Sequence, residues 1–335
     1  MASDNSVAGA VSRVTPDILQ VKVPLPFPLR WVNSYLVRGS GGYTLIDPGL
    51  HTEEAVRVWE QSLAHANIAY AEIAQIVLTH HHPDHYGLTG LFQQRTGAPV
   101  RLSRVGLEQA QRLWGPGQPL TDAIVRLFIR HGIAEEPLRQ LKPHLDSFVP
   151  LVSPQPEIQP IEAGETLRIG DRSCVAIETA GHAAGHMCLY DEAAQLMFCG
   201  DHVLPQISPN VSYIPGVDDN PLASFLSSLA DIAAYPVQLA LPGHREPFRA
   251  FAERARELIR HHDERLERMR VALLTPMTCY ELCIAIFSAK LPIHQLRFAL
   301  SETIAHVLYL LQSGQVTEEE CDGKLIYRSN VMSGF

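Results

Sequence analysis

The chain has 335 residues, 46% of them hydrophobic, so it can bury a large core and exceeds the size of a typical single domain. Its net charge of −9 argues against a dedicated nucleic-acid binder, because contacts to phosphates need clustered Lys and Arg. The first twenty residues contain no apolar secretory signal, and no apolar run approaches the roughly 18–20 residues of a membrane span. We therefore expect a cytoplasmic protein.

The first third of the chain is predicted to alternate apolar strands with amphipathic helices. The helix expected at 53–66 places Val56, Trp59 and Leu63 on one face, which is typical of a helix that packs on a sheet. In chain order we expect strands at 18–23, 33–37, 43–46, 76–78 and 100–102, and helices at 53–66 and 88–97.

Residues 104–149 form an insertion that is far longer than an ordinary connection. Its apolar spacing predicts a helical pair, with helix breaks at 115–117 and at Gly132. Trp114 and Phe128 suit a lid or wall of an apolar substrate pocket as well as they suit extra packing or a homodimer surface. These alternatives stay open on the sequence alone.

The remainder of the chain is predicted to continue with strands at 175–177, 196–198 and 238–241, then helices at 246–274, 278–287 and 293–311, and a hairpin at 315–327. His261 and His262 are expected on the polar face of the first of these helices. Residues 276–335 contain four Lys or Arg and six Asp or Glu, a net charge of −2, so the hairpin is not expected to read DNA. Six cysteines without paired spacing are expected to be thiols.

A dense group of potential metal ligands directly follows the strand expected at 76–78. The pattern H-x-H-x-D-H contributes His80, His82, Asp84 and His85. Because one tetrahedral ion rarely needs so many ligands from one segment, the pattern suggests two metal ions. The alternative is a solvated loop that is histidine-rich by chance.

Potential ligands also follow other expected strands. Gly181-His182, Gly200-Asp201 and Gly243-His244 each place a glycine directly before the candidate ligand, where it permits sharp backbone geometry. Asp47 follows the strand expected at 43–46. Since the ends of several strands can meet at one edge of a sheet, we expect these side chains to converge.

These motifs, in this order, resemble the metallo-β-lactamase superfamily, which includes glyoxalase II, lactonases and several nucleases. The resemblance covers about residues 18–250 and implies an α/β fold, the αββα sandwich. It assigns one metal to His80, His82 and His182, the other to Asp84, His85 and His244, and a bridging position to Asp201. It also implies that Asp47 and His186 support the ligands from a second layer.

The branch within the superfamily is suggested by Asp201, because antibiotic-degrading members often have a cysteine there. The carboxylate, together with Asp84 and His85, looks like the glyoxalase II and lactonase types. The basic and aromatic tail with which glyoxalase II grips glutathione is not matched. The tail instead resembles the winged-helix-like appendage of the lactamase-β-like ribonuclease branch, so we expect a hydrolase domain at 1–250 and a helical, winged-helix-like domain at 251–335.

The function implied is a metal-dependent hydrolase in which a metal-bridging hydroxide cleaves an acyl ester, thioester or lactone. Zinc is the expected metal, with iron or manganese as alternatives. Asp84 is the expected catalytic residue, and Asn210 and Tyr213 are expected to bind a small-molecule substrate. The alternatives are a phosphodiesterase or endoribonuclease of the same superfamily and a non-enzymatic metal-binding module.

Overall fold

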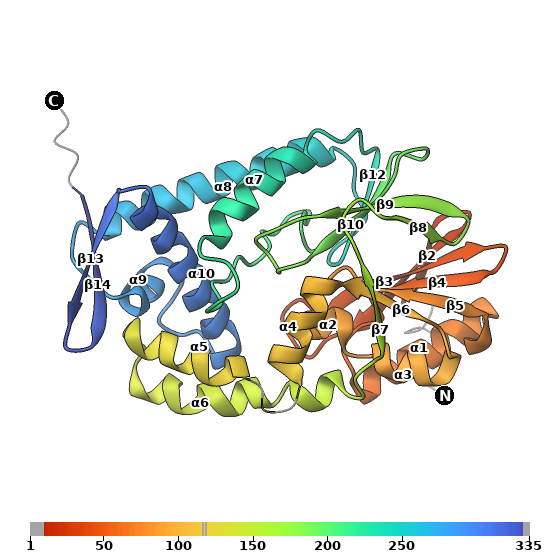
Figure 1. The fold of residues 1–335 in the computed structure, drawn as a ribbon, viewed down its shortest axis with the longest axis horizontal. Helices are drawn as coiled ribbons and strands as arrows, with labels where there is room; N and C mark the ends of the chain where they lie inside the picture. Colours follow the sequence, from red (N-terminus) through yellow and green to blue (C-terminus); the bar gives the residue numbers. More distant parts are fainter. Residues whose placement is uncertain (1–9, 116, 118, 331–335) are drawn as a thin grey trace.

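The structure is a computed structural model that describes residues 10–115, 117 and 119–330. Two sheets lie face to face in one half of the molecule, and a mostly helical region extends from them (Figure 1). The first sheet has seven strands in sequence order, and the second has five in the order β12-β11-β10-β9-β8. The first sheet comprises β1 (Val11–Thr15), β2 (Ile18–Pro24), β3 (Trp31–Gly39), β4 (Gly42–Ile46), β5 (Ile73–Val77), β6 (Val100–Ser103) and β7 (Ile158–Ile161).

The second sheet comprises β8 (Thr166–Ile169), β9 (Arg172–Glu178), β10 (Met187–Asp191), β11 (Leu196–Gly200) and β12 (Leu239–Pro242). Apolar side chains of the two sheets, such as Tyr35 and Phe198, meet between them, with ring centroids 5.6 Å apart. Helices α1 (Glu53–Ala66) and α3 (Thr89–Thr96) pack on the outer face of the first sheet. Helix α7 (Pro221–Ile232) packs on the outer face of the second. The layers are therefore helix, sheet, sheet, helix, as predicted.

The strand directions bring the candidate ligands to one edge of the sandwich. Strands β4 and β5 pair in parallel, as do β11 and β12, so the carboxyl ends within each pair lie together. Asp47 follows β4, the histidine block follows β5, Asp201 follows β11, and His244 follows β12. The short helix α2 (Pro83–Tyr86) carries Asp84 and His85.

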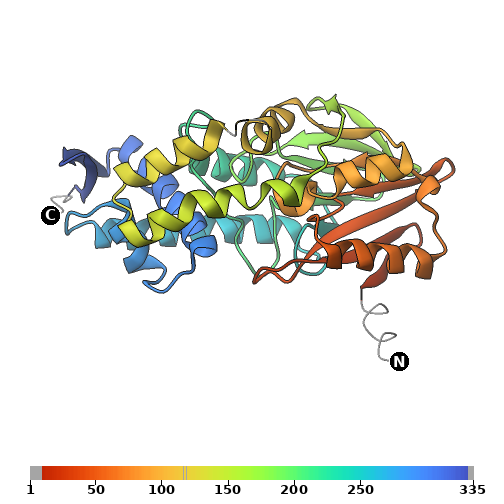
Figure 2. The ribbon, with the colours of Figure 1, turned by 90° about the horizontal axis from the view of Figure 1, so that it is seen from below.

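The insertion at 104–149 contains three helices, so the prediction of a helical pair was wrong. They are α4 (Arg104–Trp114), α5 (Pro119–Arg130) and α6 (Glu135–Asp146), and the 3₁₀ turn η2 (Val149–Val152) follows. Gly132, with φ of 85°, turns the chain between α5 and α6, and each of the two predicted breaks separates a pair of helices. Leu141 and Leu145 of α6 belong to the same buried cluster as the C-terminal helices, so α6 packs against that region (Figure 2).

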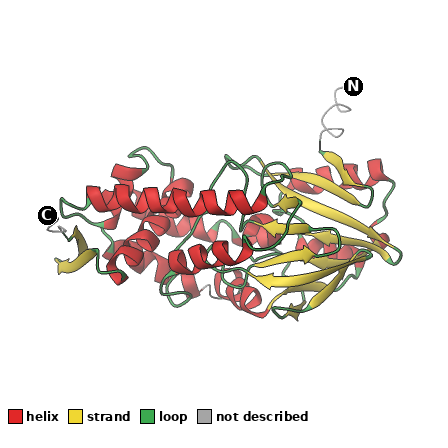
Figure 3. Ribbon diagram, turned by 90° about the horizontal axis from the view of Figure 1, so that it is seen from above, coloured by secondary structure: helices red, strands yellow, loops and turns green. Residues whose placement is uncertain are grey.

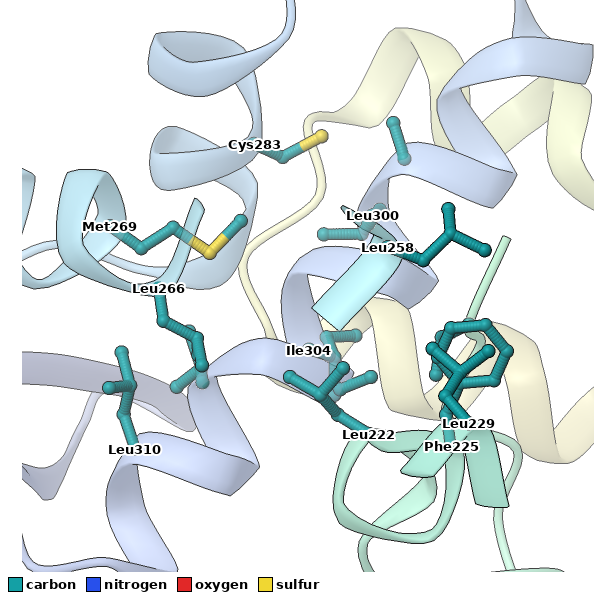
Figure 4. Packing of buried hydrophobic residues seen from close by; sticks show 14 of the residues in the cluster. Leu222, Phe225, Leu229, Leu258, Leu266, Met269, Cys283, Leu300, Ile304 and Leu310 are labelled. Carbon is teal, nitrogen blue, oxygen red and sulfur yellow. The ribbon is translucent and has the colours of Figure 1, made fainter. Parts of the chain in front are cut away.

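The C-terminal region consists of α8 (Phe251–Ala272), α9 (Cys279–Ile286), α10 (Ile293–Gln312) and the hairpin of β13 (Val316–Cys321) and β14 (Lys324–Ser329). Helices fill this half of the molecule, and the hairpin lies at the end opposite the sandwich (Figure 3). Leu258, Leu266, Leu300 and Ile304 interdigitate in its core (Figure 4). Helix α8 starts at Phe251 and not at 246, because Phe248 pairs with Ala240 of β12.

Two other expectations depend on burial. Five of the six cysteines are buried free thiols, whereas Cys321 on the hairpin is exposed. His262 is fully buried and lies 3.0 Å, Nδ1 to Nε2, from His306, so its expected place on a polar face was wrong. No helix among the described residues has the length and apolarity needed to cross a membrane.

Candidate metal centre

Three histidines from two loops form the first group of candidate ligands. His80 and His82 follow β5, and His182 follows β9. One nitrogen from each lies within 4.8 Å of the others, and the Nε2 atoms of His80 and His182 are 3.4 Å apart. Three imidazoles so arranged match a common ligand set for a divalent transition metal.

Asp84, His85 and His244 form the second group, and the Asp201 carboxylate stands between the two groups. Nε2 of His244 is 3.2 Å from Oδ2 of Asp84. Asp201 Oδ1 lies 3.4 Å from His85 Nε2, and Oδ2 lies 3.3 Å from His244 Nε2. The same Oδ2 lies 3.7 Å from Nε2 of His182 in the first group. The Asp201 carboxylate thus lies close to imidazole nitrogens of both groups.

Two polar atoms of this centre are buried without hydrogen-bond partners and are suited to bind divalent cations. Nε2 of His85 and Oδ1 of Asp201 are buried, and neither has a hydrogen-bond partner among the described residues. Buried polar atoms are rarely left unpaired, because desolvation without a partner is costly. An imidazole nitrogen and a carboxylate oxygen are both ligands that zinc prefers. The donor set therefore fits two divalent ions.

In four of the five histidines, the second ring nitrogen is fixed by a partner outside the centre. Such contacts set the orientation of a metal-binding imidazole and decide which nitrogen carries the proton. The Nδ1 partners are Thr79 Oγ1 for His80 (3.0 Å), Asp47 Oδ2 for His85 (2.9 Å), the Asn210 carbonyl for His182 (2.8 Å) and the Trp31 carbonyl for His244 (2.9 Å). In all four residues Nε2 is left to face the centre.

Asp47 and His186 contact the candidate ligands from behind. Asp47 has φ of 51° and accepts hydrogen bonds from the Thr79 amide at 2.8 Å and the Thr79 hydroxyl at 2.7 Å, besides its contact with His85. Nε2 of His186 accepts the Asp201 amide hydrogen at 3.1 Å. Nδ1 of His186 is 2.7 Å from Thr179 Oγ1, so this imidazole joins β9 to the segment that carries Asp201.

The electrostatics of the two groups differ. Burial, followed by repulsion from neighbouring histidines, holds the pKa values of His80 and His82 well below the ordinary value. Burial alone would also lower the pKa of His244, but the Asp201 and Asp84 carboxylates together outweigh it and raise the pKa to about 10. Burial likewise opposes ionisation of Asp201, yet His244 and His85 hold its pKa well below the usual range. The carboxylates thus concentrate negative charge at the second group.

The glycines before two ligands are required by space and by backbone conformation. Gly181 has φ of 103°, a conformation that residues with a side chain rarely adopt. A Cβ atom there would stand 2.5 Å from Cα of Phe225 on α7. A Cβ atom at Gly243 would lie 2.6 Å from Cε1 of His85. His182 and His244 can therefore approach the centre only because no side chain precedes them.

Asn210 occupies a different position from the one expected. Its side-chain amide donates to Glu302 Oε2 at 2.8 Å and to the Phe298 carbonyl at 3.3 Å, and its Oδ1 accepts from the Ser212 hydroxyl. Its hydrogens are therefore already engaged, which favours a supporting role under His182 over the substrate contact we expected. Tyr213 is anchored to α10 through its backbone, since its amide donates to the Ser301 carbonyl at 3.2 Å.

A group of aromatic and basic side chains around the start of α10 was not predicted from the sequence. His294, Arg297 and Phe298 lie on the first turns of α10, and His294 stacks on Phe27 with ring centroids 4.2 Å apart. Phe148 directly precedes η2, and its ring centroid lies 5.9 Å from that of Phe27. The spacing of 294, 297 and 298 places these side chains on one helical face, a signal that was present in the sequence.

Comparisons with known proteins match both halves of the chain. The profile of the metallo-beta-lactamase superfamily matches residues 29–244. The chain belongs to the metallo-β-lactamase superfamily. A second profile, described as the metallo-beta-lactamase-like C-terminal domain, matches residues 266–330. This superfamily member is 28% identical over 333 residues to the probable metallo-hydrolase YqjP of Bacillus subtilis, covering 93% of this chain and 98% of that protein.

A solved metallo-beta-lactamase family protein from Thermus thermophilus is 34% identical, with a TM-score of 0.85, and the match covers 95% of this chain and all of that one. An atrochrysone carboxyl ACP thioesterase from Aspergillus chevalieri is 25% identical over 263 residues, which cover 78% of this chain and 66% of that protein. These findings confirm the predicted family, fold and enzyme class, a metal-dependent hydrolase.

Proposed function

We propose that the protein is a dinuclear metal hydrolase that cleaves an acyl ester, a thioester or a lactone. The observation that carries this proposal is the position of Asp201, a single carboxylate between two groups of candidate ligands. His80, His82 and His182 would hold one ion, and Asp84, His85 and His244 the other. When bound, two zinc ions, or iron or manganese in their place, would polarise the substrate carbonyl and activate a water at neutral pH.

The chain's own side chains supply orientation and a proton acceptor. Asp84 is half-buried, and burial alone would raise its pKa, but its hydrogen bond to His244 lowers the pKa below the ordinary value. Asp84 is therefore ionised at neutral pH, and its carboxylate can accept the proton of the attacking water. Because the metal ligands and Asp84 account for the chemistry, no serine or thiol nucleophile is required. Cys199 in particular is buried in the core.

Two observations favour an acyl substrate over a phosphodiester. The relative from Aspergillus chevalieri acts on an acyl thioester, as its name states. The C-terminal hairpin presents Glu318, Glu319 and Glu320 as exposed side chains, and the chain has a net charge of −9, so a polyanion would be repelled.

Steady-state kinetics on the metal-loaded protein test this proposal. We expect model thioesters, aryl esters or lactones to be turned over with a higher kcat/KM than bis-p-nitrophenyl phosphate or RNA, and a chelator to abolish the rate. If a phosphodiester is the better substrate by about tenfold, roughly 1.4 kcal/mol of transition-state preference, the acyl assignment is wrong. If a chelator leaves all hydrolysis intact, the metal assignment is wrong as well.

A further inference from the structure

Helix α10 carries Arg297, whose half-buried guanidinium has no acidic partner among the described residues. No carboxylate oxygen among the described residues lies within 4.0 Å of it, and its Nε is buried without a hydrogen-bond partner. The other half-buried arginines of the C-terminal helices are each paired with a carboxylate: Arg254 with Glu257, Arg265 with Glu302 and Arg270 with Glu267. A buried guanidinium that lacks an acceptor is costly, so such a group implies a partner from outside the protein.

Aromatic rings surround this cation and leave its edge free. Cζ of Arg297 lies 3.9 Å from the ring centroid of Phe298 and 4.9 Å from that of Phe148. His294 lies against Phe27 and against His144, with ring centroids 4.2 and 5.5 Å away. Because a guanidinium that stacks on rings still donates in its own plane, its N–H groups remain available. We call this group the Arg297 cluster: Phe27, His144, Phe148, His294, Arg297 and Phe298.

The Arg297 cluster adjoins the metal centre. Burial lowers the pKa of Arg297 to about 10, and the neighbouring group that raises it is Asp84 of the second ligand group. The ring centroids of Trp114 and Phe148 are 6.4 Å apart. The indole N–H of Trp114 donates a hydrogen bond of 3.3 Å to the backbone carbonyl of His81, within the histidine block. The cluster is therefore joined to the histidine block through Trp114, and the charge of Arg297 interacts with that of Asp84.

We propose that Arg297 binds an acidic group, a carboxylate or a phosphate, on the substrate that the metal centre hydrolyses. This inference rests on the proposed function. The planar fork of a guanidinium pairs with two oxygens of such a group, and these charged hydrogen bonds are strong where water is excluded. The rings of the cluster suit an apolar segment between the acidic group and the scissile carbonyl. The substrate class is thus an ester or thioester of an acid that carries a second, anionic group.

The competing explanation is that Arg297 merely packs on Phe148 and Phe298. A packing role would make Arg297 equally important for charged and uncharged substrates. A binding role makes it important for the charged substrate alone. The ratio of kcat/KM for an acidic ester to that for its uncharged counterpart therefore separates the two explanations.

The test uses the metal-loaded full chain and three p-nitrophenyl esters: the monoester of glutaric acid, the same ester with its free carboxyl methylated, and a phosphonate analogue. We expect Arg297→Gln to lower the ratio of acidic to methylated substrate by about tenfold or more, the range for a charged hydrogen bond. Arg297→Lys should give an intermediate ratio, since it keeps the charge without the fork. The carboxylate and phosphonate esters distinguish the two kinds of acidic group.

Arg268→Gln is the matched control, because Arg268 is exposed on α8 and its loss changes the net charge equally. It should leave the ratio at the wild-type value. Melting temperatures of the metal-loaded variants establish that each is folded. An unchanged ratio in folded Arg297→Gln, with all esters still hydrolysed, would overturn the inference and leave the proposed function intact.

Calorimetric titration with glutarate and monomethyl glutarate gives a readout that does not need hydrolysis. Each ligand has one carboxylate that can reach the metals, and only glutarate has a second. We expect glutarate to bind wild type more tightly, and Arg297→Gln to remove that advantage. If no ester is hydrolysed but this difference is observed, the acyl-hydrolase proposal fails while the anion site stands. If glutarate has no advantage in wild type, the anion site is refuted.

Discussion

Replacing Asp47 by Asn removes one acceptor from a carboxylate that orients His85. Asp47 Oδ1 accepts the Thr79 amide hydrogen, whereas Oδ2 accepts the Thr79 hydroxyl and Nδ1–H of His85. An asparagine offers only one oxygen. With its nitrogen in the Oδ2 position, His85 must move its proton to Nε2, the atom that faces Asp201. With its nitrogen in the Oδ1 position, two donors confront each other at the Thr79 amide.

Both arrangements carry a penalty of comparable size, the first in metal affinity at the second position and the second in folding stability. Loss of a contact that orients a metal-binding imidazole costs about 10- to 100-fold in affinity, roughly 1.4 to 2.7 kcal/mol. An amide hydrogen left without an acceptor in this buried place costs about 1 to 3 kcal/mol. Since the unpaired Thr79 amide opposes the second arrangement, we expect the first to be populated and Asp47→Asn to weaken the second metal site by about 10- to 100-fold.

Competition with a chromophoric chelator measures the two affinities. Asp17→Asn is the control, because Asp17 accepts bonds of 2.7 and 2.9 Å from Arg172 and is not a partner of any candidate ligand. The control should lower the melting temperature without changing either metal affinity. If Asp47→Asn binds both ions as tightly as wild type, Asp47 does not orient His85 in the way its contacts indicate.

Metal content, catalysis and acid stability each give a separate test. Protein purified without chelator should contain two divalent metal ions per chain by elemental analysis, and a reproducible value near one after zinc supplementation would contradict the dinuclear site. Asp84→Ala should abolish most hydrolysis while circular dichroism and the melting temperature stay near wild type; full turnover would refute its role. Burial holds the pKa of His306 at about 3 and of His262 at about 2, below the ordinary 6.5, so the unfolded chain binds protons that the folded chain does not. Stability should therefore fall as pH drops below 6.5, by up to about 1.4 kcal/mol per pH unit for each histidine, and urea unfolding of His306→Gln should show a shallower fall. An equal fall in both proteins would contradict the assignment.

The sequence predicted those parts of the protein whose causes are local. Helix α1 has the predicted bounds, because Thr52 caps its first turn and Trp59 and Leu63 lie on its buried face. The candidate ligands were found because each follows a strand, and His182 and His244 also follow a glycine. Short-range patterns of this kind do not depend on which other segment lies nearby.

Features that depend on distant segments were missed or misread. Asn210 contacts Glu302 across 92 residues of sequence, and His262 contacts His306 across 44. Helix α7 was not predicted, although Asn220 caps it and the side chain accepts the amide hydrogen of Ala223. No periodicity in the sequence specifies the contacts of Asn210 with Glu302 or of His262 with His306, since these contacts arise when distant segments pack together.

The C-terminal region reaches the metal centre from two sides, which explains why the ligand motifs predict the reaction better than the substrate. On one side, Arg265 pairs with Glu302, Glu302 accepts the amide of Asn210, and the Asn210 carbonyl holds Nδ1 of His182. On the other side, Arg297 of the same helix interacts electrostatically with Asp84, which raises the pKa of its guanidinium. The ligands at the strand ends determine a hydrolytic chemistry that the superfamily shares. Helix α10 both supports a ligand and presents the unpaired cation, so we expect substitutions along this helix to change which substrate is cleaved before they change how it is cleaved.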